Sequence, residues 1–507
     1  MSRRARSPAA RTSRSAPAPS FDEVNIDRTA QTIWRQDASG RLVSTIPAAA
    51  NLRLAAPASR WWAEVQSIFL PAGYPESVRP EYIRFQAFDT LQAACSYLRS
   101  ILTTSAILKA SGVGEDKASP MAAAITWVLR DGVGMFGSLV FSYLVGASFD
   151  VHVKEWRLFA DLINDVGLTL DMFAPLVGGG TPFAIVAAVG AACKTICGMV
   201  AGATRASITA HFAMRSNLAD VSAKENAQET GITLLGLLGG SLLAQKLGDS
   251  ARTAWLAFGV LTALHVWANV LGVGCLTFSF LNPQRANLVC TRWWATWQHS
   301  SESARKGLAR RAGETSGAAE LSPALIARAE RIWRPLLLWR RGPRLGVSLG
   351  QLLDTSAADG GASQLRDLQA IFRSSGYLLR LDPSGVAHVA LRDGADGGTA
   401  LRALLHAATL RRGSFGIAPE RRRQEWARTL NRTFLPDLDL LATRPARPPE
   451  SGRGLGEEER LALTESLALT DACWEAFAAT LDGCGWDEAA LRVEHCCGPM
   501  RVKITSE

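Results

Sequence analysis

Residues 198–230 read GMVAGATRASITAHFAMRSNLADVSAKENAQET and form a polar stretch between the two most apolar parts of the chain. Before it, residues 172–193 carry no charged side chain, and after it residues 254–281 have only His265 and Cys275 as ionisable groups. A polar stretch between such neighbours is either a loop at a membrane surface or a helix that lines a wet cavity. It indicates where a site would lie but names no reaction.

Three apolar segments surround this stretch. Residues 254–281 are long enough to cross about 30 Å of hydrocarbon and are the best transmembrane candidate. Residues 232–247 form a shorter apolar helix, and residues 172–193, interrupted by prolines and glycines, are expected to form two half-helices or a re-entrant element. The arginines and tryptophans that follow residue 281 are typical of an anchor at the lipid interface. They are Arg285, Arg292, Trp293, Trp294 and Trp297.

The clearest amphipathic helix covers residues 154–171, where Arg157 and Asp161 lie one turn apart and can pair. In a lipid-facing bundle this pair would point inward, because a charge at mid-bilayer costs about 3 kcal/mol or more. In a soluble protein the same face would meet water, and the sequence leaves both alternatives open. Gly132, Gly134 and Gly137 form a GxGxxG, but no βαβ unit surrounds them, so we expect close helix packing instead of dinucleotide binding.

The predicted fold is mainly α: a polytopic helical membrane domain over residues 61–300, followed by a small soluble α+β domain over residues 301–507. Residues 377–381 and 386–391 flank a DPSG turn and predict a hairpin, and residues 399–409 predict a helix. Residues 1–60 begin with a segment that is rich in Arg and Ser and free of acids. We expect this leader to be a disordered basic tail or a transit peptide.

Composition excludes several function classes. The net charge of +9 is concentrated in the leader and after the apolar run, which fits the positive-inside rule and gives no nucleic-acid module. The nine cysteines form no CxxC pair and predict neither a disulfide framework nor a zinc ribbon. The residue types of Cys484, His495, Cys496 and Cys497 are those of zinc ligands, but their spacing fits no common zinc site. No metal or cofactor is therefore expected.

Enzyme motifs give equally little, since neither HExxH nor a P-loop occurs. The one GxSxG, around Ser348, follows a basic, proline-broken segment instead of a strand, so we expect no enzyme. The first hypothesis is a membrane protein that acts by binding partners. The alternative is a small-molecule or ion carrier with a polar cavity among broken helices. The candidate cavity or interaction residues are Arg130, Asp131, Arg157, Asp161, Asp165, Arg205, His211, Arg215, Asn217, Asp220, Lys224 and Glu225.

A series of motifs in order also resembles one known family, the root UVB sensitive family, over roughly residues 61–287. They are FLPAGYPESVRPEYIRFQAFDTLQ (residues 69–92), GVG (112–114), RDGVGMFG (130–137), KEWRLFADLIND (154–165), AGATRASITAHFAMRSNLADVSAKENAQET (201–230) and LTALHVWAN (261–269). Several long motifs in one order make the resemblance specific. The first 60 residues fall outside it.

The resemblance implies a membrane-associated protein with no established reaction and no catalytic or cofactor residues. Plant members of that family are linked to seedling development, UV-B tolerance, auxin distribution and vitamin B6 homeostasis, and some work as pairs. The expected partners are thus the lipid membrane and a second family member or copy of the chain, with no nucleic acid. If the leader is a transit peptide, the compartment is a plastid or mitochondrion. A soluble pyridoxal phosphate binder is a third hypothesis that the vitamin B6 link alone suggests.

Overall fold

The chain divides into two compact units in the computed structural model. One unit holds Met1–Tyr82 with Thr209–Ile232, and the other holds Ile83–Ile208 with Thr233–Glu507. The structure describes residues 20–24, 31–36, 41–45, 57–110, 120–178, 180–247, 250–299, 321–332, 342–354, 359, 361–382, 385–413, 454–486 and 501–502.

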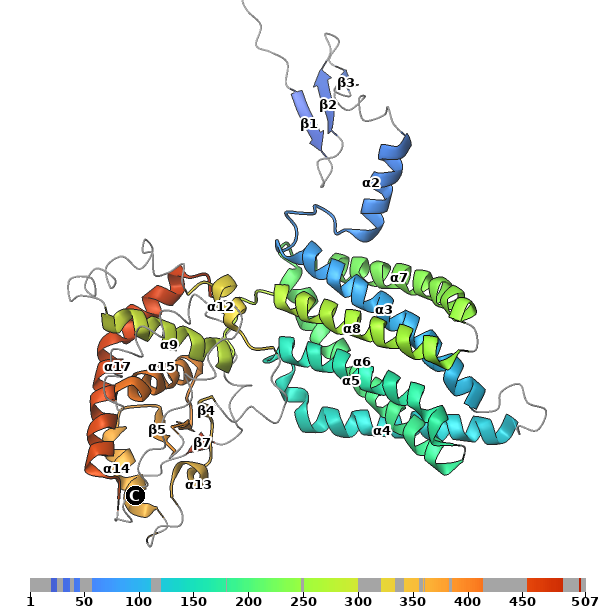
Figure 1. Cartoon of the computed structure of the whole chain (residues 1–507). Helices are drawn as coiled ribbons and strands as arrows, with labels where there is room; N and C mark the ends of the chain where they lie inside the picture. The colour runs from blue at the N-terminus through green and yellow to red at the C-terminus, as the bar shows by residue number, and fades with distance from the viewer. Residues whose placement is uncertain are drawn as a thin grey trace, which may run out of the picture. The chain divides into compact units, whose positions relative to one another are not determined.

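The first unit opens with a three-stranded antiparallel sheet of β1 (Ser20–Val24), β2 (Gln31–Gln36) and β3 (Leu42–Thr45). In the register of this sheet, Trp34 of β2 lies opposite Phe21 of β1. Three segments of residues 1–60, which were expected to be a disordered basic tail or a transit peptide, are thus strands in the structure. Residues 1–19 lie outside the described residues. Helix α2 (Pro57–Phe69) follows the sheet (Figure 1).

The polar stretch consists of two helix ends and the turn between them. Helix α6 (Thr181–Phe212) runs through its first half, and α7 (Leu218–Leu247) begins in its second half. Between them Ser216 adopts a left-handed conformation, with φ at 54°. The backbone of the turn pairs with an extended segment before α3: the amide of Met214 donates to the carbonyl of Ser77 at 3.3 Å. Of the two sequence alternatives, the stretch is mainly helical, and its turn is held by the chain itself.

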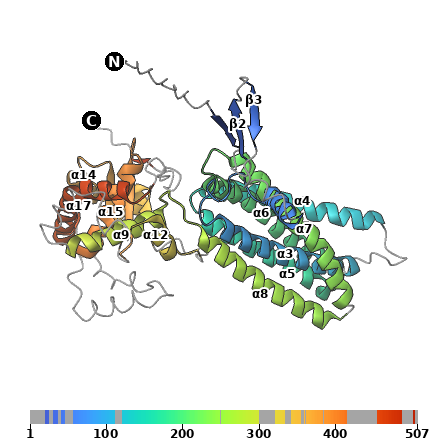
Figure 2. The same ribbon diagram turned by 90° about the horizontal axis from the view of Figure 1, so that it is seen from above.

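The second unit contains a helical bundle that Figures 1 and 2 show as long rods side by side. Its helices are α3 (Tyr82–Ala110), α4 (Pro120–Val145), α5 (Val153–Phe173), α6 as far as Ile208, α7 from Thr233 onward and α8 (Ala251–Cys275). Residues 172–193 were expected to form two half-helices or a re-entrant element. They hold the end of α5, a short 3-10 helix (Ala174–Val177) and the start of α6, because Pro175 and the glycines after it interrupt the helix only once.

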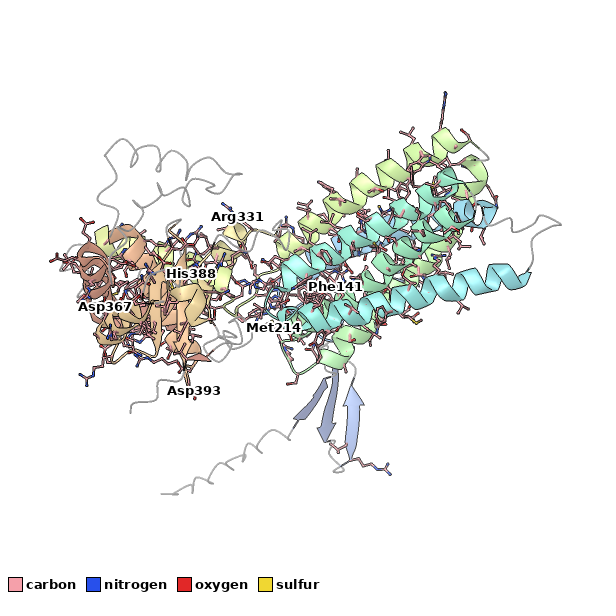
Figure 3. The ribbon with its side chains drawn as sticks, turned by 90° about the horizontal axis from the view of Figure 1, so that it is seen from below. Phe141, Met214, Arg331, Asp367, His388 and Asp393 are labelled. Carbon is pink, nitrogen blue, oxygen red and sulfur yellow. The ribbon has the colours of Figure 1, made fainter. Side chains whose placement is uncertain are left out.

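Small residues and rings set the distances between the bundle helices. A Cβ on Gly236 of α7 would lie 2.7 Å from Cβ of Tyr97 in α3, and one on Gly134 of α4 would lie 2.7 Å from Oγ1 of Thr195 in α6. The prediction of close helix packing is therefore confirmed for Gly134. It is wrong for Gly132, where a Cβ would meet nothing within 4 Å, and Gly137 makes only an ordinary contact at 3.8 Å. Phe141 of α4 packs edge-on against Trp156 of α5, with ring centroids 5.9 Å apart, inside the bundle (Figure 3).

Three of these helices, α6, α7 and α8, are long and apolar enough to cross a membrane. In the most apolar 18-residue segment of each helix, only 33% (α6), 11% (α7) and 33% (α8) is buried within the protein. Large apolar side chains instead face outward on α4, α6, α7 and α8. They include Val133, Phe136, Leu139, Leu144, Ile185, Val189, Leu234, Leu238, Leu242, Leu256 and Val260.

The C-terminal part of the second unit is an α+β domain. Its sheet contains β4 (Arg344–Leu345), β5 (Tyr377–Leu381), β6 (Ala387–Arg392) and β7 (Arg501–Val502), and β6 pairs with the other three. The predicted hairpin is confirmed, with Leu379 opposite Val389. The helices are α9 (Pro283–His299), α12 (Pro323–Ala329), α13 (Leu349–Leu352), α14 (Ala362–Ile371), α15 (Gly397–Gly413) and α17 (Glu457–Gly483). Helix α15 confirms the helix predicted at residues 399–409.

The predicted lipid anchor after residue 281 is wrong. Trp293 of α9 is buried in the core of the C-terminal domain, where its ring packs on Phe477 and its Nε1 donates to Oγ1 of Thr480 at 3.3 Å. Arg285 is 1% exposed and lies over the rings of Phe278 and Phe280. The sequence could not separate these cases, because Trp and Arg suit both a lipid interface and a packed core. The packing of the C-terminal domain thus begins near residue 281, ahead of the predicted boundary at 301.

Candidate functional site

A row of buried polar side chains runs through the bundle between α3, α5 and α8. Its centre is Asp165 of α5, whose Oδ1 lies 2.7 Å from Nη1 of Arg99 in α3 and 3.0 Å from Nδ1 of His265 in α8. Arg99 and His265 are at most 1% exposed. Such a charge-assisted contact is stronger than a neutral hydrogen bond, and its partners are costly to bury unless they are paired.

The row continues along α5 toward its first turn. Arg157 lies 2.8 Å from Oδ1 of Asp89 in α3 and 3.6 Å from Oδ2 of Asp161, one turn further along α5. Residues 157, 161 and 165 are spaced four apart and therefore share one helix face. Matching stripes of polar residues on the other two helices complete the row. They are Gln92, Ser96 and Arg99 of α3 and Thr262, His265 and Asn269 of α8.

A small cavity of about 10 Å³ lies where the row meets the outside of the bundle. This volume has room for about one water molecule. Asp89, with a side chain 34% exposed, is its most accessible charged group. The residues that line it are Phe85, Phe88, Asp89, Gln92, Arg157, Ala268, Asn269, Gly272 and Val273.

A second charged cluster joins α4, α5 and α6. The carboxylate of Asp171 at the end of α5 contacts the ammonium of Lys194 in α6, and Nη2 of Arg130 in α4 lies 3.8 Å away. Gly190, one turn before Lys194, permits this approach, because a Cβ there would lie 2.8 Å from Oδ1 of Asp171. The charges of α4, α5 and α6 thus face one another within the bundle.

In the first unit the polar side chains bind the segment before α3. Nε2 of His211 lies 3.0 Å from Oε1 of Glu81, and Glu225 accepts from the hydroxyl of Thr209 at 2.6 Å. The other contacts are Asn217 with the carbonyl of Ser77 (3.2 Å), Asp220 with the amide of Ala72 (2.8 Å) and Lys224 with the carbonyl of Ser67 (2.6 Å). These side chains fix the path of the backbone.

The structure thus brings some predicted site residues together and distributes the rest. Arg157, Asp161 and Asp165 form the polar row, and Arg130 joins the cluster at Asp171. Asp131 is exposed on α4, and Arg205 is half-buried on α6. Arg215 is exposed at the turn between α6 and α7. The first unit contains His211, Asn217, Asp220, Lys224 and Glu225. Asn217, Asp220 and Lys224 bind backbone groups there, whereas His211 and Glu225 bind the side chains of Glu81 and Thr209.

Several residues of the row were not predicted as site residues. Asp89, Arg99, His265 and Asn269 lie on α3 and α8, far in sequence from the charges of α5. The available signal was their spacing at helical intervals, together with the isolation of His265 in an apolar run. Asp171 and Lys194 were missed in the same way.

The C-terminal domain contains a buried histidine with two hydroxyl partners. His406 of α15 lies between the hydroxyls of Tyr377 (3.1 Å) and Ser466 (2.8 Å), and burial lowers its pKa to about 3. A neutral, fully enclosed imidazole serves packing here. Ser348, the serine of the GxSxG, forms a capping box with Gln351 at the start of α13. Within the described ranges no three potential ligands gather as a metal site, while His495, Cys496 and Cys497 lie outside those ranges.

Comparison with known proteins shows which family the chain resembles. Residues 56–296 match the family described as the vitamin B6 photo-protection and homoeostasis domain. The chain is 39% identical over 270 residues to protein root UVB sensitive 3 of Arabidopsis thaliana, covering 52% of this chain and 61% of the relative. It is 40% identical over 224 residues to RUS family member 1 of Dictyostelium discoideum, covering 44% of this chain and 42% of the relative.

A third relative is protein root UVB sensitive 2, chloroplastic, of Arabidopsis thaliana, which is 33% identical over 45% of this chain and 52% of the relative. The chain therefore spans 42% to 61% of the length of these three relatives. No solved structure matches it. The match covers every helix of the bundle and both polar clusters. Through residues 56–296, the chain is similar to the root UVB sensitive family.

Proposed function

We propose that the bundle is integral to a membrane, with α6, α7 and α8 in contact with lipid. The observation that supports this is the inverted distribution of side chains: charges such as Arg99 and Asp165 are buried, while Leu238 and Val260 are each 60% exposed. A water-soluble bundle buries its apolar stripe and exposes its charges. In lipid the preference reverses, because an unpaired charge is costly there and an exposed leucine is not.

Extraction tests this proposal. We expect the full chain to stay in the membrane pellet after washing with alkaline carbonate and to dissolve only in detergent. Recovery in the carbonate supernatant would refute it. A peripheral protein and a known integral protein from the same membranes provide the two reference behaviours.

Within the membrane, we propose that the chain acts by binding a protein partner and contributes to vitamin B6 homeostasis, the process named in its family's description. The paired charges of the polar row support a binding role, and the cavity beside it, of about 10 Å³, has room for about one water molecule. Loss of the chain should change the cellular ratio of B6 vitamers. The variant Arg157→Gln is then expressed in cells that lack the chain. Recovery of the vitamer ratio would show that the polar row is not needed for this role.

The carrier alternative is favoured by a specific feature, the cavity that connects the accessible Asp89 to the buried row. Carriers use charged side chains among helices near mid-bilayer to bind their cargo. Uptake of pyridoxine, pyridoxal and pyridoxal phosphate into proteoliposomes tests this alternative. A carrier should lose uptake in Arg157→Gln and retain it in Asp131→Asn, whose side chain is exposed outside the row. Equal uptake in both variants, or none in the unmodified chain, would exclude it.

A further inference from the structure

Helix α2 carries an exposed apolar stripe. Its positions 61, 65 and 68 are spaced four and three apart and therefore share one helix face. On this face Trp61 and Ile68 are 62% and 52% exposed, and Val65 between them is half-buried. Gln66 and Ser67 are exposed as well, but they point away from the stripe. The helix is thus amphipathic, and its apolar face is open.

Helix α7 fixes the end of α2. Nζ of Lys224 donates to the carbonyl of Ser67 at 2.6 Å, and Nε2 of Gln228 donates to the carbonyl of Phe69 at 2.6 Å. Both carbonyls belong to the last turn of α2, where helix carbonyls have no partner within their own helix. One turn further along α7, Gly231 leaves room for the ring of Phe69, since a Cβ there would lie 3.3 Å from Cε1 of that ring. Residues 224, 228 and 231 therefore form one stripe of α7 that holds α2.

This stripe crosses the point at which α7 changes from polar to apolar. Residues 218–230 include Asp220, Lys224, Glu225 and Glu229, whereas residues 231–245 contain no charged side chain. If α7 lies in lipid, as the proposed function requires, the edge of the hydrocarbon lies near residue 231, because charged side chains are costly beyond it. Leu238 lies about 10 Å deeper along the helix axis. The end of α2 is thus held at the edge of the hydrocarbon.

We propose that α2 lies on the membrane surface, with Trp61 and Ile68 at the boundary between lipid headgroups and acyl chains. The orientation fits, because α2 runs across the direction of the first half of α7 within the first unit (Figure 1). Tryptophan is enriched at this boundary, and amphipathic helices sink their apolar face about 5 to 10 Å into it. The inference rests on the proposed function and adds to it a helix that binds the lipid surface without crossing it.

A depth measurement tests the proposal. A fluorescent amino acid replaces Trp61, Gln66 or Leu238, one at a time, in the full chain in liposomes. Its quenching is compared between lipids that carry a nitroxide on the acyl chain just below the headgroup and lipids that carry it at the chain centre. We expect the probe at 61 to be quenched more by the shallow nitroxide and the probe at 238 more by the deep one. The probe at 66 is the matched control on the opposite face of α2, and both nitroxides should quench it less than they quench the probe at 61.

The outcomes separate this inference from the proposed function. If neither nitroxide quenches the probe at 238, α7 does not lie in lipid and the proposed function fails. If the probe at 238 is quenched by the deep nitroxide but the probes at 61 and 66 are quenched equally, or neither is quenched, only the placement of α2 is overturned. Iodide in the aqueous phase adds one more case: a probe at 61 that is shielded from both nitroxides and from iodide would show that a protein segment covers the stripe, which would also overturn the inference.

Discussion

The buried triad of Lys154, Arg285 and Glu330 yields the sharpest stability prediction. Glu330 follows α12, and its two oxygens lie 2.7 Å from Nζ of Lys154 in α5 and 2.8 Å from Nη2 of Arg285 in α9. All three side chains are at most 1% exposed. Burial opposes the charge of Glu330, but Arg285 and Lys154 outweigh it and hold its pKa below the ordinary value. The carboxylate is therefore ionised at neutral pH.

Glu330→Gln keeps the shape of the side chain and removes its charge. Each ion pair is worth about 4 kcal/mol at an effective dielectric constant of about 20. The remaining amide oxygen still accepts a hydrogen bond, so we expect a net loss of about 3 to 5 kcal/mol, the usual result when one partner leaves buried charges unpaired. Glu465→Gln, at an exposed site of α17, is the matched control and should change stability by less than about 0.5 kcal/mol.

The assay is guanidinium unfolding of the full chain in detergent. Unfolding is monitored by the fluorescence of buried tryptophans such as Trp293 and Trp486. A cycle with Lys154→Met adds a second test, because the double variant should lose less than the sum of the two single variants. A loss of under about 1 kcal/mol in Glu330→Gln, or strict additivity in the cycle, would refute the reasoning that the triad is a coupled, buried ion cluster.

The remaining predictions concern a helix contact and a buried histidine. Gly236→Ala should lower the thermal midpoint of unfolding, because the new Cβ would lie 2.7 Å from Cβ of Tyr97. Gly239→Ala is the control and should leave the midpoint unchanged, because its Cβ would lie 3.6 Å from Leu98. Equal shifts of the two midpoints in calorimetry would contradict this packing. His406 has a pKa of about 3 when folded and about 6.5 when unfolded, so the unfolded state gains the proton first and stability should fall as pH drops from about 6.5 toward 3. In His406→Asn, this part of the pH profile should flatten, and an unchanged slope would show that another group causes it.

Local patterns predicted local structure well. The hairpin of residues 377–391 followed from alternation around a DPSG turn, and α15 followed from its apolar periodicity. Residues 218–247 were harder, since their first half is polar and their second half apolar. The sequence suggested two segments, but no proline interrupts them and they form one helix, α7. Helix continuity depends on backbone breakers more than on polarity.

Contacts between distant residues could not be predicted in the same way. The spacing of Arg157, Asp161 and Asp165 indicated a shared face of α5, but nothing in the sequence showed that Arg99 and His265 would meet it. For Arg285 the sequence position was misleading. Its place after an apolar run suggested a lipid anchor, but its side chain pairs with Glu330, which follows α12. Tertiary packing decides which partner a charged side chain contacts. Helical periodicity carries no information about that packing.

The central claim is that the outward apolar faces of the bundle lie in lipid while its charges face inward. It is tested most directly by placing benzoyl-phenylalanine at Leu238 of α7, Val260 of α8 and Leu461 of α17, which are 60%, 60% and 58% exposed, and illuminating native membranes. We predict lipid adducts at positions 238 and 260 and none at 461. Absence of lipid adducts at both bundle positions, or equal yields at all three, would contradict the claim.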